Sequence, residues 1–385
     1  MPRSTIYFAL AATAALMPMT AGACSPAEVA SVPLGSSSWD VRIQGDYAFI
    51  ANNENGLRVI DISAPTMPVT ETAVSLAGDF FQNMTISGNT AYLCNISFGP
   101  SFVACDITDP ANASFLAFRI LQGAPGGHVQ DLSADGNLIA CTETTFGVLH
   151  LYDITTPSNP FEAGQFPTSP GNAAVALIGT TAFVGNPATQ ELLALDVSSP
   201  ATPTVLDSVS ISTSDTYAIA LAGDHAYVAT GAALVTVDIS DPMAMAVTDT
   251  LPAPAGASFQ EIGLSGERMV LGGPATSAFS LELTDPAAPA MQGSIDFVTH
   301  LARGVATNGR YLFVASDTSG LKVVDLISCP IGADLDGSGG VGGADLAILL
   351  AAWGPCPMTG PCPADLNNDG VVDAADLAIL LAGWG

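Results

Sequence analysis

Two twelve-residue stretches near the end of the chain place oxygen-bearing side chains at the spacing of a calcium-binding loop. The later stretch reads DLNNDGVVDAAD, and the earlier one reads DLDGSGGVGGAD. In such loops, positions one, three, five and twelve supply side-chain oxygens, position seven supplies a backbone carbonyl, and position nine often acts through water. The expected ligands are Asp365, Asn367, Asp369, the Val371 carbonyl, Asp373 and Asp376 in the later loop, and Asp334, Asp336, Ser338, the Gly340 carbonyl and Asp345 in the earlier loop.

The two loops differ at position nine, and this difference predicts two calcium ions held with unequal affinity. The later loop has Asp373 at this position, whereas the earlier loop has Gly342, so a water molecule must complete the earlier site. We therefore expect the earlier loop to bind calcium more weakly. Magnesium fits these loops less well, because it requires a stricter octahedron and keeps more of its own water.

Each loop is followed by nearly the same apolar helix, DLAILLAAWG after the first loop and DLAILLAGWG after the second. The leucines at helical spacing are Leu346, Leu349 and Leu350 in the first helix, and Leu377, Leu380 and Leu381 in the second. We expect these leucines to pack the two halves together, with Trp353 and Trp384 capping the same core. The alternative is a leucine patch that faces a partner.

The paired loops and helices of residues 329–385 resemble a dockerin domain, in which two F-hand-like calcium loops share one small module. The resemblance implies a cohesin-like partner and a link to polysaccharide-degrading enzymes held on a scaffold. Dockerins often contact cohesin through Ser or Thr at loop positions ten and eleven, where this chain has Gly343-Ala344 and Ala374-Ala375. This departure favours a calcium-stapled stability or attachment module. A module this small is expected to need the metal to fold.

A second set of polar and aromatic residues precedes or begins a strand-like run in several repeated units of the chain. In a propeller, loops at these positions line one end of the central channel. A mixture of aromatic and amide side chains there is suited to a sugar or a peptide, and ordinary loop polarity is the alternative. The set comprises Trp39, Asp40, Gln82, Asn83, His128, Tyr217, Gln260, Glu261 and Arg303.

The units that position this set repeat every 42 to 47 residues. Each copy has a hydrophobic run that ends in an acidic residue, from LRVIDIS in the first to LKVVDL in the last. A steady period in the forties with strand-like content is typical of propeller blades. We expect the acidic residues to be structural, because an aspartate before a proline turn commonly accepts backbone N–H bonds. They are Asp61, Asp106, Asp153, Asp196, Asp238, Glu282 and Asp325.

Each unit contains four short strand-like runs separated by glycine and proline turn signals, such as Gly45 and Pro65 in the first unit. The seventh unit stops after its third run, whereas AEVASVPLG before the first unit reads like a fourth strand. We therefore predict that the N-terminal strand completes the last blade. A ring closed in this way leaves no open sheet edge.

The endings LRVIDIS and LKVVDL resemble the LVIVD repeat family of bacterial exported proteins, over roughly residues 28–327. The resemblance implies a mainly β fold, which here is a seven-bladed β-propeller followed by a small α-helical dockerin-like module. The sixth copy departs from the pattern, with Glu282 in place of aspartate. The expected domains are the propeller at residues 24–328 and the dockerin-like module at residues 329–385.

Residues 1–23 have the features of a secretory signal peptide, removed before Cys24. Arg3 gives a short positive start, and an apolar core too short to span a bilayer leads to the small-residue pattern AGA. We therefore expect a secreted or cell-surface protein without a membrane span. Lipidation at Cys24, which would make a surface lipoprotein, is the alternative.

The seven cysteines of an exported protein predict disulfides with one thiol left over. We predict a bridge between Cys94 and Cys105 across a hairpin and a local bridge between Cys356 and Cys362. A third bridge, between Cys24 and Cys329, would lock the ring closure. Cys141 remains as the free thiol.

The net charge of −28, with 36 acidic residues against 8 Lys and Arg, disfavours nucleic acid and anionic membranes as partners. The sequence contains no nucleophile motif, phosphate loop or HExxH zinc motif, and no catalytic residue is assigned. We therefore favour a non-catalytic binding or scaffold propeller carrying a calcium-dependent attachment module. The alternative is a polysaccharide-degrading enzyme, a glycosidase or a lyase, with its site in the propeller channel.

Overall fold

The structure is a computed structural model that describes residues 26–75, 80–95, 99, 101–121, 127–211, 215–297, 301–326, 335, 342–356, 362, 364–366 and 370–382. Several sequence predictions lie outside these residues. They are the signal peptide, the Cys24–Cys329 bridge, the Trp384 cap and the loop ligands Asp334, Asp336, Ser338, Gly340, Asn367 and Asp369. Within the described ranges, the helices are all too short or too polar to cross a membrane.

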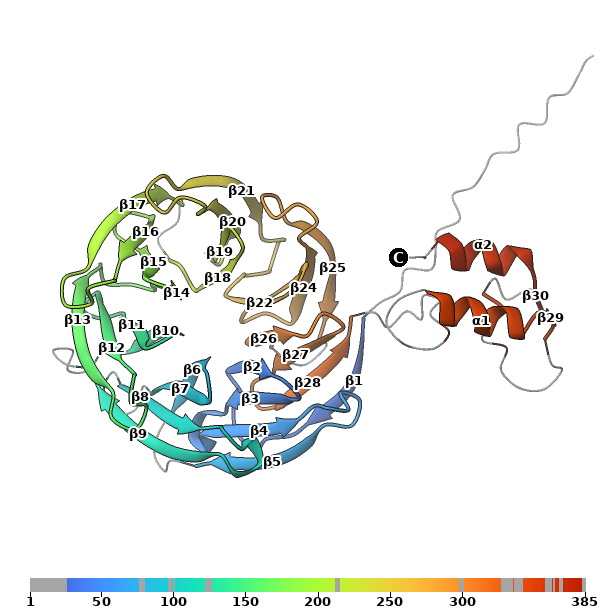
Figure 1. The fold of residues 1–385 in the computed structure, drawn as a ribbon, viewed down its shortest axis with the longest axis horizontal. Helices are drawn as coiled ribbons and strands as arrows, with labels where there is room; N and C mark the ends of the chain where they lie inside the picture. Colours follow the sequence, from blue (N-terminus) through green and yellow to red (C-terminus); the bar gives the residue numbers. More distant parts are fainter. Residues whose placement is uncertain are drawn as a thin grey trace, which may run out of the picture.

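Seven four-stranded antiparallel sheets form the described repeat region and stand around a common centre (Figure 1). Blades one to four are β2 (Asp40–Gln44), β3 (Tyr47–Ala51), β4 (Leu57–Asp61) and β5 (Val69–Val74); β6 (Phe81–Ser87), β7 (Thr90–Asn95), β8 (Ser101–Asp106) and β9 (Ser114–Ile120); β10 (Val129–Asp135), β11 (Leu138–Glu143), β12 (Val148–Asp153) and β13 (Phe161–Pro167); and β14 (Val175–Ile178), β15 (Thr181–Asn186), β16 (Glu191–Asp196) and β17 (Thr204–Ser210).

Blades five to seven are β18 (Ala218–Ala222), β19 (His225–Ala229), β20 (Ala233–Asp238) and β21 (Ala246–Pro252); β22 (Glu261–Ser265), β23 (Arg268–Gly272), β24 (Ser277–Glu282) and β25 (Ala290–Asp296); and β26 (Gly304–Thr307), β27 (Tyr311–Ala315), β28 (Leu321–Asp325) and β1 (Ala27–Val32). Two short 3-10 turns, η1 (Asn53–Asn55) and η2 (Pro110–Asn112), lie in blades one and two. The first strand of each blade faces the centre, and the fourth lies at the rim (Figure 1). The predicted seven-bladed propeller is confirmed.

The turns between first and second strands explain the recurring glycine. Gly45 and Gly266 have φ values of +58° and +57°, in a left-handed region that glycine enters at no steric cost. Each stands first in a two-residue hairpin turn, where a positive φ matches the twist of the flanking strands. A further irregularity recurs at the rim, where the outer strand pairs with its neighbour through a register shift in every blade. Such bulges increase the local twist.

The ring is closed by the N-terminal strand, as predicted. β1 pairs antiparallel with β28, so the last blade is built from both ends of the repeat region. Lys322, the only lysine of the chain, reaches from β28 to β1, and its Nζ lies 3.0 Å from Glu28 Oε1 and 3.0 Å from Ser31 Oγ. The closing strand is therefore joined by side chains as well as by its backbone ladder.

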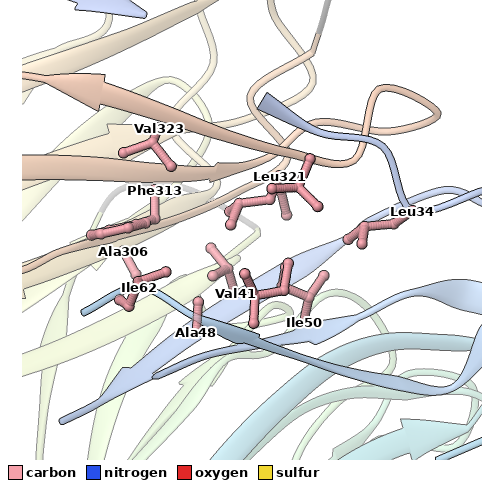
Figure 2. Close-up of a cluster of buried hydrophobic side chains, with 12 residues drawn as sticks. Leu34, Val41, Ala48, Ile50, Ile62, Ala306, Phe313, Leu321 and Val323 are labelled. Carbon is pink, nitrogen blue, oxygen red and sulfur yellow. The ribbon is translucent and has the colours of Figure 1, made fainter. Parts of the chain in front are cut away.

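Apolar side chains from facing sheets pack together between neighbouring blades. Figure 2 shows the cluster between blades one and seven, where Val41, Ile50 and Ile62 meet Phe313 and Val323. These side chains are nearly or fully buried. Burial on both faces of each sheet explains why the second and third strands read as continuous hydrophobic runs.

Five of the seven acidic landmarks at the ends of third strands accept a backbone N–H as the sequence indicated, whereas Glu282 and Asp325 pair with arginine side chains. Asp61 Oδ1 accepts the backbone N–H of Ser63 at 2.8 Å, and Asp196 Oδ1 accepts that of Ser198 at the same distance. Hydrogen bonds from the hydroxyl and the backbone N–H of the residue two positions on lower the pKa of both aspartates. The same contact recurs at Asp106, Asp153 and Asp238.

The described C-terminal residues form two short helices, α1 (Gly343–Ala351) and α2 (Ala374–Ala382), and a small ladder of β29 (Gly354–Pro355) with β30 (Val371–Val372). The predicted Cys356–Cys362 disulfide is present. Leu349 and Leu380 are fully buried, as predicted.

The expected packing of the other leucines is wrong in part, because each helix buries a narrower stripe. Leu350 is 51% exposed and Leu381 is 52% exposed, while Leu346 and Leu377 are half-buried at the edge of the core. Residues one position apart in a helix point about 100° away from each other. Trp353, at 48% exposure, does not cap the core either.

The predicted Cys94–Cys105 bridge is wrong. Cys94 lies opposite Phe102 on the neighbouring strand, whereas Cys105 lies opposite Ala91. The two thiols therefore project from opposite faces of the sheet, Cys94 toward blade three and Cys105 toward blade one. Both are buried and unbridged, as is Cys141.

Candidate functional site

A cavity of about 510 Å³ opens at one end of the channel, and all seven blades contribute to its wall. Eight of the nine channel residues singled out in the sequence line it. They are Trp39, Gln82, Asn83, His128, Tyr217, Gln260, Glu261 and Arg303. We call this space the mouth cavity.

The ninth residue, Asp40, lies beneath the mouth cavity. It is fully buried, and its carboxylate accepts the backbone N–H groups of Val41 at 2.7 Å and Met84 at 2.9 Å. The second contact joins blade one to blade two. Asp40 therefore supports the wall of the channel and does not face the mouth cavity.

The same backbone contact holds four of the lining residues at equivalent places in their blades. The N–H groups of Trp39 and Arg303 donate to Ala51 and Ala315, each at the end of the neighbouring second strand. The equivalent bonds of Tyr217 and Gln260 run to Ala229 and Gly272. Each of these side chains therefore extends from a hydrogen-bonded backbone position just before or at the start of the first strand of its blade. Rigid strands beneath a variable rim are a common setting for binding residues.

An aromatic–cation pair forms one side of the mouth cavity. The guanidinium carbon of Arg303 lies 3.9 Å from the centroid of the Trp39 ring, and Arg303 Nη2 lies 3.5 Å from Asp317 Oδ2. Among the described residues, the buried Trp39 Nε1 and Arg303 Nε atoms have no hydrogen-bond partner. Two N–H donors on the same side of the mouth cavity therefore have no acceptor from the protein.

Several lining residues were missed by the sequence analysis. Thr144 follows a second strand, Asn172 and Gly171 belong to a Gly/Pro-rich connection, and Asp215 precedes a first strand. Counting back from each first strand would have found Asp215. The same count back from β14 would have found Asn172.

A second, smaller space of about 190 Å³ lies along the inner strands, and we call it the inner cavity. Asn83, Tyr217 and Glu261 line both spaces, which places the inner cavity directly beyond the mouth cavity. Arg42 and Asp131 line only the inner cavity.

The inner cavity gathers polar groups from blades one, two, three and six. Arg42 Nη2 lies 3.1 Å from Asp40 Oδ2, and its Nε donates to the Met84 carbonyl at 3.0 Å. Asp131 accepts the N–H of Leu132 on one oxygen and that of Val175 on the other, both at 2.9 Å. Asn83 Nδ2 donates to Asp131 Oδ1 at 3.1 Å.

Burial raises the pKa of all three carboxyl groups in this region. It raises the pKa of Asp131 to about 7, opposed by the backbone N–H of Val175 and by Arg42. It raises the pKa of Glu261 well above its usual range, with the nearby charges of Asp40 and Asp131 adding to the effect. Burial also raises the pKa of Asp40, opposed by Arg42. In each case the environment favours the neutral, protonated form of the carboxyl group.

At the C-terminal module, Asp345 and Asp376 are almost completely buried. Asp376 accepts the backbone N–H groups of Leu366 and Asp373, each at 2.7 Å, and Asp365 accepts that of Gly370 at 2.9 Å. Cys356, Cys362 and Asp365 also cluster, but the two sulfurs form a disulfide and offer no thiolate to a metal.

The closed ring and its central cavities define the class of protein: a seven-bladed β-propeller. Residues 35–75, 214–250 and 301–330 match the LVIVD repeat, so this propeller contains LVIVD repeats in blades one, five and seven. No curated protein sequence matches the chain.

Solved structures support the same fold at low sequence identity. The β-propeller domain of Cps50 (Swd1) from Myceliophteria thermophila has a TM-score of 0.64 at 13% identity, over 78% of this chain and 99% of that one. A chain of the mitotic checkpoint complex gives 0.62 at 14% identity, over 85% and 99%. The computationally designed protein Ika8 gives 0.57 at 10% identity, over 78% and 99%. At this identity the likeness concerns the fold alone.

Proposed function

We propose that this chain is a secreted, non-catalytic binding propeller, which holds a sugar or peptide in the mouth cavity and is attached through a calcium-dependent C-terminal module. The observation that carries the proposal is the convergence of side chains from all seven blades on one cavity. A concave site with a few fixed polar groups is the usual form of a ligand pocket. Secretion follows from the expected signal peptide.

The unpartnered donors support a ligand that carries oxygen acceptors. Burying an N–H without an acceptor costs about 1–3 kcal/mol. Trp39 Nε1 and Arg303 Nε are both in this situation, and a ligand oxygen would remove the cost if a shift of the two side chains let it reach these covered atoms. Sugar hydroxyl groups and peptide carbonyl groups both provide such an oxygen.

The described loop residues of the C-terminal module fit a calcium ion. Asp376 is a fully buried carboxylate, and both helices lack a lysine or arginine that could neutralise it. Asp365, Asp373, Asp376 and the Val371 carbonyl supply the hard oxygen atoms that calcium prefers. When bound, calcium would supply a positive charge beside these carboxylates. The hydrogen bonds that Asp376 accepts from the backbone N–H groups of Leu366 and Asp373 tie the start of the loop to its end.

The exposed leucines of the module are where we propose that a cohesin-like protein docks. Ile348 and Leu350 on α1 are 37% and 51% exposed, and Ile379 and Leu381 on α2 are 40% and 52% exposed. The same apolar pair thus occurs on both helices. The double variant Leu350→Ser and Leu381→Ser should lose calcium-dependent binding to a cohesin module. Equal binding by the variant and the parent protein would overturn this assignment.

A titration of the full chain with a panel of polysaccharides and blocked peptides tests the binding proposal. We expect saturable binding of one ligand per chain, weakened at least tenfold by Trp39→Ala and unchanged by Trp353→Ala. Release of new reducing ends from a polysaccharide would favour the enzyme alternative. A mature N-terminus bearing a lipid at Cys24, detected by mass spectrometry, would favour the lipoprotein alternative.

A further inference from the structure

Asp40, Asp131 and Glu261 stand around the inner cavity with one cation, Arg42, so once these carboxyl groups are ionised Arg42 alone does not balance their charge. Arg42 forms its close ion pair with Asp40. Asp131 binds backbone N–H groups with both oxygens, but these donors carry no full charge. Within the described part of the chain, the Glu261 carboxylate has no direct hydrogen bond or ion pair, and the nearby charge of Arg42 is the one that attracts it. Glu261 is also a residue that lines both cavities.

Donors and acceptors without partners lie at different depths of the same site. The unpartnered donors, Trp39 Nε1 and Arg303 Nε, belong to residues that line only the mouth cavity. The unpartnered carboxylate, Glu261, stands where the mouth cavity passes into the inner cavity. A matching ligand therefore has acceptor oxygens in the part that lies in the mouth cavity. It also has one positive charge on a side chain that extends into the inner cavity.

We propose that the ligand is a peptide segment with a lysine or arginine side chain, whose cationic end enters the inner cavity beside Glu261 and Asp131 while its backbone carbonyl groups face Trp39 and Arg303. This inference rests on the proposed binding function of the mouth cavity. At pH values where Asp131 and Glu261 are ionised, a peptide is favoured over a neutral sugar, because hydroxyl groups would leave these carboxylates without a counter-charge.

A bare divalent cation fits this place less well than an organic cation. Among the described residues, the ligand atoms of Asp40, Asp131 and Glu261 do not come close enough together to form a metal-binding group. A flexible side chain with several N–H donors can reach carboxylates that stand apart. Anionic ligands are disfavoured by the same excess of negative charge.

The probes are blocked tripeptides, acetyl-Gly-X-Gly-amide, in which X is Lys, Arg, N-acetyl-lysine or Glu, titrated calorimetrically against the full chain at pH 8. We expect one Lys or Arg peptide to bind per chain, N-acetyl-lysine to bind at least tenfold more weakly, and Glu not to bind. Glu261→Gln should weaken binding of the Lys peptide at least tenfold.

Glu267→Gln is the matched control, because it removes the same charge from the exposed turn that follows the strand of Glu261. It should bind the Lys peptide like the parent protein. Equal loss in both variants, or equal affinity for Lys and N-acetyl-lysine, would overturn the inference. A neutral sugar that binds through Trp39 but is unaffected by Glu261→Gln would also overturn it, while leaving the proposed binding function intact. If no probe or polysaccharide binds, both proposals fail.

Discussion

At the scale of single residues, Asp131 makes the stability of the propeller depend on pH. Its folded-state pKa is about 7, well above the ordinary value of an aspartate, so the folded state keeps a proton that the unfolded state loses. The free energy of unfolding should therefore rise as the pH falls from about 7 toward about 4, with a slope approaching about 1.4 kcal/mol per pH unit for one proton. Chemical denaturation at a series of pH values measures this slope.

The variant Asp131→Asn should reduce the slope by the share of one proton, because its side chain does not titrate, while the raised pKa values of Asp40 and Glu261 keep the remainder. Asp61 and Asp196 have lowered pKa values, so their contribution to the free energy of unfolding is lost only at pH values below the range in which Asp131 acts. Asp196→Asn is therefore a suitable control and should keep the slope of the parent protein. Identical slopes for the parent protein and Asp131→Asn would contradict the assignment.

Residue roles could be predicted from the sequence where a repeat gives each residue an equivalent in other blades. The aspartates before proline turns and half of the residues that line the mouth cavity were found in this way. Asp131 was missed although it is the equivalent of Asp40: each accepts the N–H of the next residue and an N–H from the following blade. The Cys94–Cys105 error has a different origin, since a hairpin prediction brings strands together without fixing which faces the thiols occupy.

At the scale of elements, the contact between β1 and β28 holds the ring closed, and Lys322 joins the two strands. Replacing Lys322 by Met should lower the free energy of unfolding by about 1 kcal/mol, since Glu28 is partly exposed and its pairing is screened by solvent. Equilibrium unfolding in urea measures this loss. Arg268→Met is the control, because the 3.9 Å contact of Arg268 with Glu282 lies within blade six. A larger loss in the control would contradict a special role for the closing strand.

Adjacent leucines in each C-terminal helix are expected to contribute differently to stability. Leu380→Ala should destabilise the module by about 2–5 kcal/mol, because Leu380 is fully buried and its removal leaves a cavity. Leu381→Ala should have little effect on stability, because half of that side chain is already exposed. Hydrogen exchange of the α1 and α2 amides compares the two variants. Equal loss of protection in both would contradict the buried stripe described here.

These helices show what periodicity predicts and what it leaves open. The apolar spacing indicates a helix correctly, but a sequence of three leucines in five positions does not say how wide the buried stripe is. The width depends on the surface that the helix meets. Here Leu349 and Leu380 pack with Ala364 and Val372, which form a small core. Leu350 and Leu381 extend beyond it.

At the scale of the whole molecule, the steady repeat and the incomplete seventh unit were sufficient to predict the number of blades and the way the ring closes. These features follow from chain-wide spacing and from the need to cover sheet edges. The ligand could not be predicted in this way, because it depends on side chains that meet only after all seven blades are assembled. The unpartnered donors and the unbalanced carboxylates become visible only in the folded ring.

The most direct test of the account uses the three tryptophans, because Trp39 lies at the mouth cavity while Trp353 and Trp384 belong to the C-terminal module. An amide and indole ¹H–¹⁵N NMR spectrum of the full chain resolves one indole signal from each. We predict that the Lys tripeptide shifts the Trp39 indole signal alone, and that calcium shifts only the signals of Trp353 and Trp384. A Lys peptide that leaves the Trp39 signal unmoved at saturation, or shifts the other two instead, would contradict the claim that the seven blades form a binding site at their centre.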